Sequence, residues 1–370
     1  MVNPTSAYAY LDWNATAPLR PEAAAAMAEV LAHTGNPSSV HRAGRGAKKR
    51  LEQARAQIAE GVGASPASVI FTSGGTEANR LALRGMPERR LIVSAIEHDS
   101  VLAAAPDAER LSVTSDGVAD LDALDRMLAT DKGPALVSLM VANNETGAIQ
   151  PVAEAAAIVH RHGALLHCDA IQAFGKISFN FSSLNANLIT LSAHKIGGPM
   201  GVGALIALPD LPIRALQTGG GQERGRRAGT ENLPGIVGFG AAASLAGDMT
   251  GVEALRDDAE RRLLATAPYA YVHGVNAPRL PNTICISMPG VAAATQVMAL
   301  DLAGVMVSAG SACSSGKVKR SHVLDAMGVP PALAESAIRI SLGWSTTEAD
   351  IDRLVEAWGA LYARTRIRAA

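Results

Sequence analysis

The sequence is poor in the features that mark several classes of protein. Only 4% of its 370 residues are aromatic, and only three are cysteine. So few aromatic side chains cannot form repeated stacking platforms for nucleic-acid bases, and three cysteines cannot staple a disulfide scaffold. No apolar run is long enough to cross a membrane, and the N-terminal MVNPTSAYAY lacks an export signal. We therefore expect a soluble, cytoplasmic protein in a reducing compartment.

An excess of charge of either sign is also missing. Lys and Arg number 33 against 34 Asp and Glu, a net charge of −1, and 48% of the residues are hydrophobic. This balance excludes a disordered chain and a generally basic surface for nucleic acid. The basic stretches RAGRGAKKR, RGRR and KVKR are interpreted as solvated faces or anion-lined pockets. At about 150 residues per domain, the length predicts two or three domains.

The first two-thirds of the chain alternate between helical periods and short apolar runs. Over residues 45–60, the apolar Ala47, Leu51, Ala54 and Ile58 share one face of a predicted helix. Apolar runs that predict strands follow at 69–71, 91–96, 135–141, 165–168, 188–191 and 202–207. Runs without polar alternation are typical of parallel strands covered by helices on both faces. We expect an open α/β domain that binds its ligand at the carboxyl ends of strands.

After about residue 247 the pattern changes to that of a smaller α+β domain. It predicts a helix at 252–267, a half-buried strand at 282–288 and a short strand at 339–342. Ser345 and Glu348 have the spacing of a capping box for a final helix. The predicted inward stripe of that helix is Ile351, Leu354, Trp358 and Leu361.

A glycine-rich turn follows the first predicted strand. In FTSGGTEAN, Gly75 and Thr76 stand where a helix is expected to begin. Glycine lets backbone N–H groups approach a phosphate at the positive end of a helix, and the Thr76 hydroxyl adds a donor. The alternative is an ordinary turn in which Thr76 caps the helix.

Two further strands end at or just before an ionisable residue. Asp169 ends the strand LLHCD and is followed by Gln172. A buried carboxylate at this position needs a cation, such as the protonated nitrogen of a pyridine ring. The alternative is that Asp169 caps the next helix. Lys195 follows another apolar strand, with Ser192 and His194 beside it. A desolvated lysine has a lowered pKa and can form a Schiff base, whereas the alternative is a surface lysine in a glycine-rich turn.

The cysteines fall into two groups. Cys168 and Cys285 lie in apolar runs, which predicts buried, unreactive thiols. Cys313 lies in GSACSSG, within a predicted loop at about 308–320, where nearby Lys317, Lys319 and Arg320 would favour its thiolate. An incidental loop cysteine is the alternative. His160, His162 and His167 form no tetrahedral ligand set with the cysteines, so no metal is predicted.

A phosphate cup, a ring-nitrogen carboxylate and a Schiff-base lysine are the usual contributions of a protein to pyridoxal phosphate chemistry. The chain indeed resembles the cysteine desulfurases of the NifS/IscS-like group, in the class V aminotransferase family of fold type I. The resemblance covers nearly the whole chain in colinear order, through YLDWNATAPLRPEA, NPSSVHRAGRGAK, FTSGGTEAN, SAIEHDSV, ANNETGAIQPV, HCDAIQAFGK, SAHKIGGPMGVGAL, GGGQERGRRAGTEN, NTICISM, GSACSSG and RISLGWSTTEADID.

The resemblance implies a role for each matching residue. Lys195 would bind pyridoxal 5'-phosphate covalently, His98 would stack on its ring and assist proton transfer, and Cys313 would accept sulfur. Asp169 and Gln172 would bond the ring nitrogen and ring hydroxyl. The phosphate would meet Gly75, Thr76, Ser192 and His194, together with Thr230 of the partner subunit in a homodimer with shared active sites. The substrate would meet Asn14, Asn144 and the guanidinium of Arg339.

The implied reaction converts L-cysteine to L-alanine and leaves a persulfide on Cys313. The sulfur would pass to acceptor proteins, such as an iron-sulfur scaffold or a tRNA-thiolation relay. The implied domains are 18–248, which binds the cofactor, and a small domain of 1–17 and 249–370. Trp13 and Ala17 depart from the common pattern, which predicts an altered pocket entrance. Alternatives are a selenocysteine lyase, an aminotransferase, or an adaptor that has lost catalysis.

Overall fold

A computed structural model describes residues 8–131, 133–247, 249–309 and 320–369, with side chains through residue 365. Its larger sheet has seven strands in the order β2-β8-β7-β6-β5-β3-β4. The strand β8 is antiparallel to both of its neighbours and the other pairs are parallel. The strands are β2 (Val69–Thr72), β3 (Arg90–Ser94), β4 (Glu109–Leu111), β5 (Ala135–Ser138), β6 (Leu165–Asp169), β7 (Leu188–Ser192) and β8 (Gly203–Ala207). The predicted α/β class and its six strands are confirmed, and β4 is additional.

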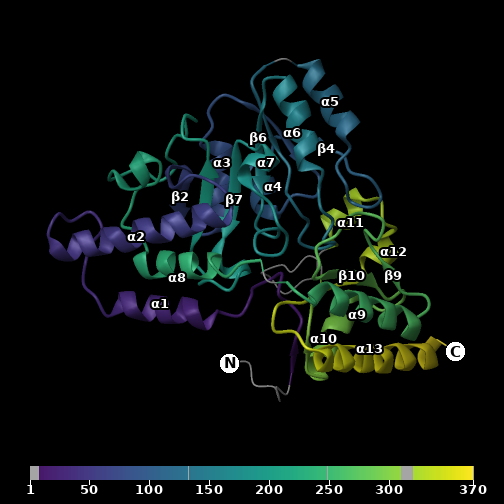
Figure 1. Cartoon of the computed structure of the whole chain (residues 1–370). Helices are drawn as coiled ribbons and strands as arrows, with labels where there is room; N and C mark the ends of the chain where they lie inside the picture. Colours follow the sequence, from purple (N-terminus) through teal and green to yellow (C-terminus); the bar gives the residue numbers. More distant parts are fainter. Residues whose placement is uncertain (1–7, 132, 248, 310–319, 370) are drawn as a thin grey trace.

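Helices cover both faces of this sheet (Figure 1). The helices α3 (Gly75–Arg84) and α4 (Asp99–Ala104) pack on one face. The helices whose apolar residues join the core of the other face are α1 (Pro21–Leu31), α2 (Arg42–Gly61), α5 (Leu121–Thr130), α6 (Val152–Arg161), α7 (Phe181–Leu184) and α8 (Leu233–Ala243). The predicted stripe of α2 is buried as expected. Short 3-10 turns at Pro66–Ser68, Ala193–Lys195 and Gln222–Gly225 complete this part.

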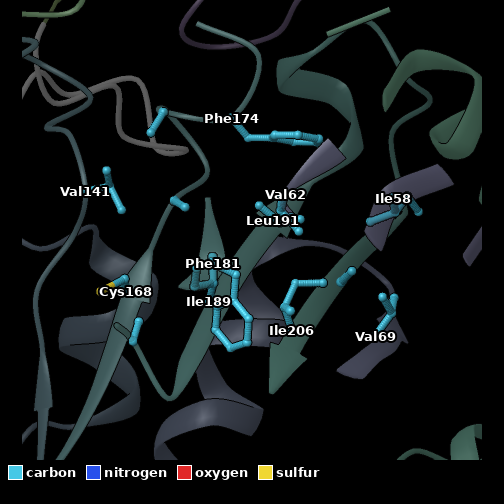
Figure 2. Packing of buried hydrophobic residues seen from close by; sticks show 14 of the residues in the cluster. Ile58, Val62, Val69, Val141, Cys168, Phe174, Phe181, Ile189, Leu191 and Ile206 are labelled. Carbon is cyan, nitrogen blue, oxygen red and sulfur yellow. The ribbon is translucent and has the colours of Figure 1, made fainter. Parts of the chain in front are cut away.

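The strands of this sheet send successive side chains into two different cores. Val69 and Phe71 of β2 join the core of α2 and α8, while Ile70 between them joins the core of α3 and α4. Figure 2 shows the first of these cores, with Ile189 and Leu191 of β7 close to Ile206 of β8. Both faces are apolar because both are covered, which explains the unbroken apolar runs of the sequence.

The remaining elements form a smaller α+β unit, at the lower right of Figure 1. Its antiparallel sheet has the order β12-β13-β10-β9, and β1 pairs in parallel with β11. The strands are β1 (Ala9–Tyr10), β9 (Tyr271–Val272), β10 (Thr283–Ser287), β11 (Val305–Met306), β12 (Ser308–Ala309) and β13 (Ala337–Ser341). The helices are α9 (Val252–Thr266), α10 (Ala293–Leu302), α11 (His322–Ala326), α12 (Pro331–Ala334) and α13 (Glu348–Ala369).

Two local expectations for this unit are wrong. The strand β10 is buried along its whole length, because Ile284 and Ile286 enter one apolar cluster while Cys285 enters another. The final helix is capped two residues later than predicted. Thr347 accepts from the Asp350 N–H at 3.3 Å, and the Asp350 carboxylate accepts from the Thr347 N–H at 2.8 Å. This is a capping box with Asp350 as its acidic partner.

The segment that precedes α1 packs with the second unit. Ala9 and Leu11 are fully buried in the cluster that holds Leu263 and Trp358. No helix in the described ranges is both long enough and apolar enough to cross a membrane.

Candidate active site

A cavity of about 340 Å³ opens at the carboxyl ends of β6 and β7, beside the first turn of α3 and the strand β13. This is the edge at which open α/β sheets bind ligands. Thirteen residues carry the sequence predictions, and eleven of them line this cavity: Asn14, Gly75, Thr76, His98, Asn144, Asp169, Gln172, Ser192, His194, Lys195 and Arg339. The remaining two are Thr230 and Cys313.

Lys195 ends the 3-10 turn that follows β7, with its amine in the cavity. Its Nζ donates to the backbone carbonyls of Asn14 and Ala15, each at 2.7 Å. Burial, followed by the positive charge of Arg339, lowers the pKa of Lys195 to about 8. The amine is therefore uncharged in a large share of molecules slightly above neutral pH, which is the form that attacks a carbonyl. The surface-lysine alternative does not hold.

Asp169 is joined to His98 by a chain of hydrogen bonds. Its Oδ2 accepts from Asn79 Nδ2 at 2.8 Å, and the same nitrogen donates to Ser100 Oγ at 2.9 Å. Ser100 Oγ lies 2.8 Å from His98 Nδ1. Burial raises the pKa of Asp169, while the Asn79 donor and the Ile171 N–H, 2.9 Å from Oδ1, oppose this rise. The carboxylate is thus held rigidly, without a direct ion pair to a side chain of the described residues.

The first turn of α3 supplies donors for an anion. The helix is capped by Gly74, so Thr76 is its second residue and not its cap. The Thr76 and Ser192 hydroxyls face the cavity and make no hydrogen bond within the described part of the chain. A Cβ at Gly75 would lie 2.2 Å from Ile171 Cδ1, so a larger residue there would require the Ile171 side chain to move. Burial lowers the pKa of His194 to about 4, which leaves it a neutral ring at this anion site.

Arg339 reaches the cavity from the middle of β13. Its Nη2 pairs with Asp12 Oδ1 at 2.8 Å, and its Nη1 donates to the Asn144 carbonyl at 3.1 Å. Its Nε is buried and has no hydrogen-bond partner in the described structure. These contacts hold a planar fork of donors at the cavity wall, a group suited to a carboxylate.

Two amide side chains, Asn14 and Gln172, also belong to the cavity lining. Gln172 Nε2 donates to the Asn14 carbonyl at 3.0 Å. Asn14 Nδ2 donates to Thr283 Oγ1 at 2.9 Å, which joins the segment before α1 to β10. Lys176 donates to both amide oxygens, at 2.6 Å to Asn14 Oδ1 and 2.5 Å to Gln172 Oε1.

The two other predicted residues do not lie in this cavity. Thr230 is exposed at a separate cleft of about 100 Å³, beside Glu223 and Arg227. Cys313, with Lys317 and Lys319, lies outside the described residues. Arg320, which was expected to favour its thiolate, instead pairs with Asp325 at 2.7 Å.

The other thiols and histidines have structural surroundings. Cys168 and Cys285 are fully buried free thiols, and burial raises the pKa of both. His167 bonds Ser138 and Thr190, and burial lowers its pKa to about 3. The described residues contain no group of three or more potential ligands that could hold a metal.

The basic RGRR stretch is bonded internally. Arg224 donates to the Ala67 carbonyl at 2.6 Å and Arg226 to that of Pro209 at 2.5 Å. Arg227 pairs with Glu77 at 2.9 Å. These arginines are therefore tied to the fold by specific partners as well as facing solvent.

Sequence reasoning missed several polar residues of the site. Asn79, Glu145, Lys176 and His322 either line the cavity or bond a residue that does. The signal for Asn79 was its position four residues after Gly75, which places both residues on the buried side of α3. Glu97 is buried next to His98; burial, and then repulsion by Asp169, raises its pKa well above the usual value.

Trp13 and Ala17 do not line the cavity, so the expected change of its entrance is not found there. Trp13 is buried edge-on against Trp344, with ring centroids 4.5 Å apart. Ala17 is also buried, and its N–H donates to the His194 carbonyl at 2.8 Å.

Residues 9–354 match the profile of the family described as "Aminotransferase class-V". The chain belongs to the class V aminotransferase family. It is 47% identical to a cysteine desulfurase of Cereibacter sphaeroides over 94% of each chain, and 41% identical to one of Nostoc sp. over 96% of this chain and 93% of that one.

Solved structures of NifS-like proteins agree with this assignment. A NifS-like protein of Rickettsia africae superposes with a TM-score of 0.90 at 37% identity, covering 96% of this chain and 99% of the other. The resemblance to the NifS-like group and its fold type I are thereby confirmed. The chain is an enzyme of a family that depends on pyridoxal phosphate.

Proposed function

We propose that this chain is a cysteine desulfurase that converts L-cysteine and the thiol of Cys313 into L-alanine and a persulfide on Cys313. The proposal depends chiefly on one observation: a buried lysine with a lowered pKa, a fixed carboxylate and a guanidinium fork line the same cavity. The names of the relatives support the same reaction. A solved structure described as SspA in complex with cysteine, 28% identical with a TM-score of 0.80, is consistent with the substrate.

The lining of the cavity fits pyridoxal 5'-phosphate. Free hydroxyls at Thr76 and Ser192, the first turn of α3 and the neutral His194 suit its phosphate. Asp169 suits its ring nitrogen, Gln172 its ring hydroxyl and the His98 ring its face. When bound, the cofactor supplies an electron sink for charge that develops on the substrate.

The remaining groups act on the substrate. Arg339 and Asn144 bind the carboxylate of L-cysteine, and Asn14 contributes to the same pocket. The uncharged amine of Lys195 removes the proton from the substrate Cα, and His98 assists proton transfer. Asp12 keeps the Arg339 fork in place while a substrate enters.

The sulfur atom of the substrate is transferred to the thiol of Cys313. Cys313 then passes it to an acceptor such as an iron-sulfur scaffold or a tRNA-thiolation relay. We propose a homodimer in which Thr230 of each subunit completes the phosphate site of its partner.

We also propose that the chain is divided into two domains, residues 18–248 and residues 1–17 with 249–370. Their separate apolar clusters support this division. Unpaired thiols at Cys168 and Cys285 support a cytoplasmic location.

One assay tests the activity. Purified protein loaded with pyridoxal phosphate is given L-cysteine and dithiothreitol, and we expect sulfide and alanine in equal yield. Lys195→Ala abolishes both products, whereas Cys313→Ser abolishes them but leaves the cofactor bound. Absence of alanine from the starting protein, with excess cofactor and reductant, would favour the adaptor and contradict the proposal.

A second assay separates the related enzymes. An aminotransferase needs no loop thiol, so its activity survives in Cys313→Ala. A selenocysteine lyase keeps its activity on selenocysteine in that variant while losing activity on cysteine. We expect the loss of the cysteine reaction in Cys313→Ala and no aminotransfer in either protein.

A further inference from the structure

Lys176 is a buried lysine that neither the proposed reaction nor the sequence predictions use. It lies four residues after Gln172 in the turn that follows β6, and only 8% of its surface is exposed. No carboxylate among the described residues pairs with it. Its Nζ instead donates to Gln172 Oε1 at 2.5 Å and to Asn14 Oδ1 at 2.6 Å.

These two contacts fix the direction of two amides. Both protons of even an uncharged amine are used on the two oxygens, so each amide must turn its NH₂ group elsewhere. Gln172 Nε2 consequently donates to the Asn14 carbonyl at 3.0 Å, in the wall of the cavity. Asn14 Oδ1 has a second donor, Asn282 Nδ2 at 3.1 Å, whereas no other donor to Gln172 Oε1 exists in the described structure.

Retaining an amine at this position is costly. Burial, followed by the like charges of Lys195 and Arg339, lowers the pKa of Lys176 well below that of a free lysine. An apolar side chain of the same length would avoid that cost. A purely structural role would also be expected to link Lys176 to the scaffold, but both of its partners are residues of the cavity lining.

We propose that Lys176 is a positioning residue that holds the Gln172 amide with its N–H group, and not its oxygen, toward the ring oxygen of the bound cofactor. This rests on the proposed function of the cavity as a pyridoxal phosphate site. A negatively charged ring oxygen is stabilised by a donor and repelled by an amide oxygen. Without Lys176, both orientations of the Gln172 amide become accessible.

The test uses the visible absorption band of the bound cofactor, whose pH midpoint depends on donors to the ring oxygen. In Lys176→Met we expect the midpoint to rise by about one pH unit and the affinity for pyridoxal phosphate to fall about tenfold. Lys176→Arg keeps N–H donors for the Gln172 oxygen, so its midpoint should not rise. Lys48→Met, at an exposed lysine that pairs with Glu52, should change neither quantity.

A double-mutant comparison separates positioning from general structural damage. Gln172→Leu should raise the midpoint as Lys176→Met does, and adding Lys176→Met to it should cause no further rise. An unchanged midpoint in Lys176→Met, or a full further rise in the double variant, would overturn the proposal. Far-UV circular dichroism checks the fold, and Lys176→Leu replaces Lys176→Met if the latter does not fold. If the starting protein gains no visible band at all, the proposed function itself fails.

Discussion

At the scale of single residues, the surroundings of the cavity change what each side chain can do. Lys195 would be charged in water at neutral pH, but burial and Arg339 lower its pKa to about 8. Folding therefore disfavours the charged form of Lys195. The unfolded chain therefore binds more protons between about pH 8 and pH 10.5, so the cost in stability of burying Lys195 is full below that window and falls as the pH rises through it.

The lowered pKa of Lys195 predicts the pH dependence of cofactor attachment. Only the uncharged amine reacts, so the rate of attachment should rise about tenfold per pH unit below pH 8 and level off above it. Stopped-flow absorbance after mixing the cofactor-free protein with pyridoxal phosphate measures this rate. A rate that continues to climb steeply up to pH 10, as for a free lysine, would contradict the assignment.

Asn79 is predicted to hold the Asp169 carboxylate in place and to keep its pKa from rising further. Asn79→Leu leaves one carboxylate oxygen without its donor, so we expect a roughly 10- to 100-fold loss of turnover with L-cysteine. The loss should be greatest at acidic pH, because the pKa of Asp169 rises further without the donor. Ser100→Ala keeps the bond from Asn79 to Asp169 and should lose less. Equal losses in the two variants at every pH would refute this explanation.

At the scale of elements, the ends of helices decide where chemistry and stability lie. The cap of α3 is Gly74, and this frees Thr76 to face the cavity. The cap of α13 is Thr347, although Ser345 and Glu348 have the same spacing three residues apart. Spacing alone cannot distinguish these pairs, because the choice depends on where the preceding chain leaves β13.

The capping box of α13 predicts a pair of stability measurements. Thr347→Ala removes the acceptor for the Asp350 N–H and should lower the free energy of unfolding by about 1 kcal/mol. Ser345→Ala, at the pair that the sequence suggested, should change it by no more than a few tenths of a kcal/mol. Urea denaturation of the two variants compares them directly. A larger effect at Ser345 would restore the original position of the cap.

At the scale of the whole molecule, the cavity draws on distant parts of the chain. Asn14 precedes the first helix, Lys195 follows β7, and Arg339 belongs to the second sheet. Thr230, by contrast, is exposed at a separate cleft and does not line this cavity. The proposed role of Thr230 in phosphate binding is therefore assigned to the site of a second copy of the chain.

Shared active sites predict that two inactive variants restore each other. In a mixed dimer of Lys195→Ala and Thr230→Ala chains, one of the two sites receives both intact residues. Unfolding and refolding an equal mixture should then give up to about a quarter of full activity, because half of the dimers are mixed. A mixture that stays as inactive as its two components would argue that Thr230 acts within its own chain or not at all.

The sequence by itself determined the α/β class, the family and eleven of the residues that line the cavity. It did so because apolar runs and glycine turns are local patterns, and because many motifs occur in one order. The tertiary structure alone decided which polar side chains bond to the residues of that lining. Asn79 reaches Asp169 across 90 residues of sequence, and Lys176 meets Asn14 across 162. Such contacts depend on how helices and strands pack, and no local pattern encodes them.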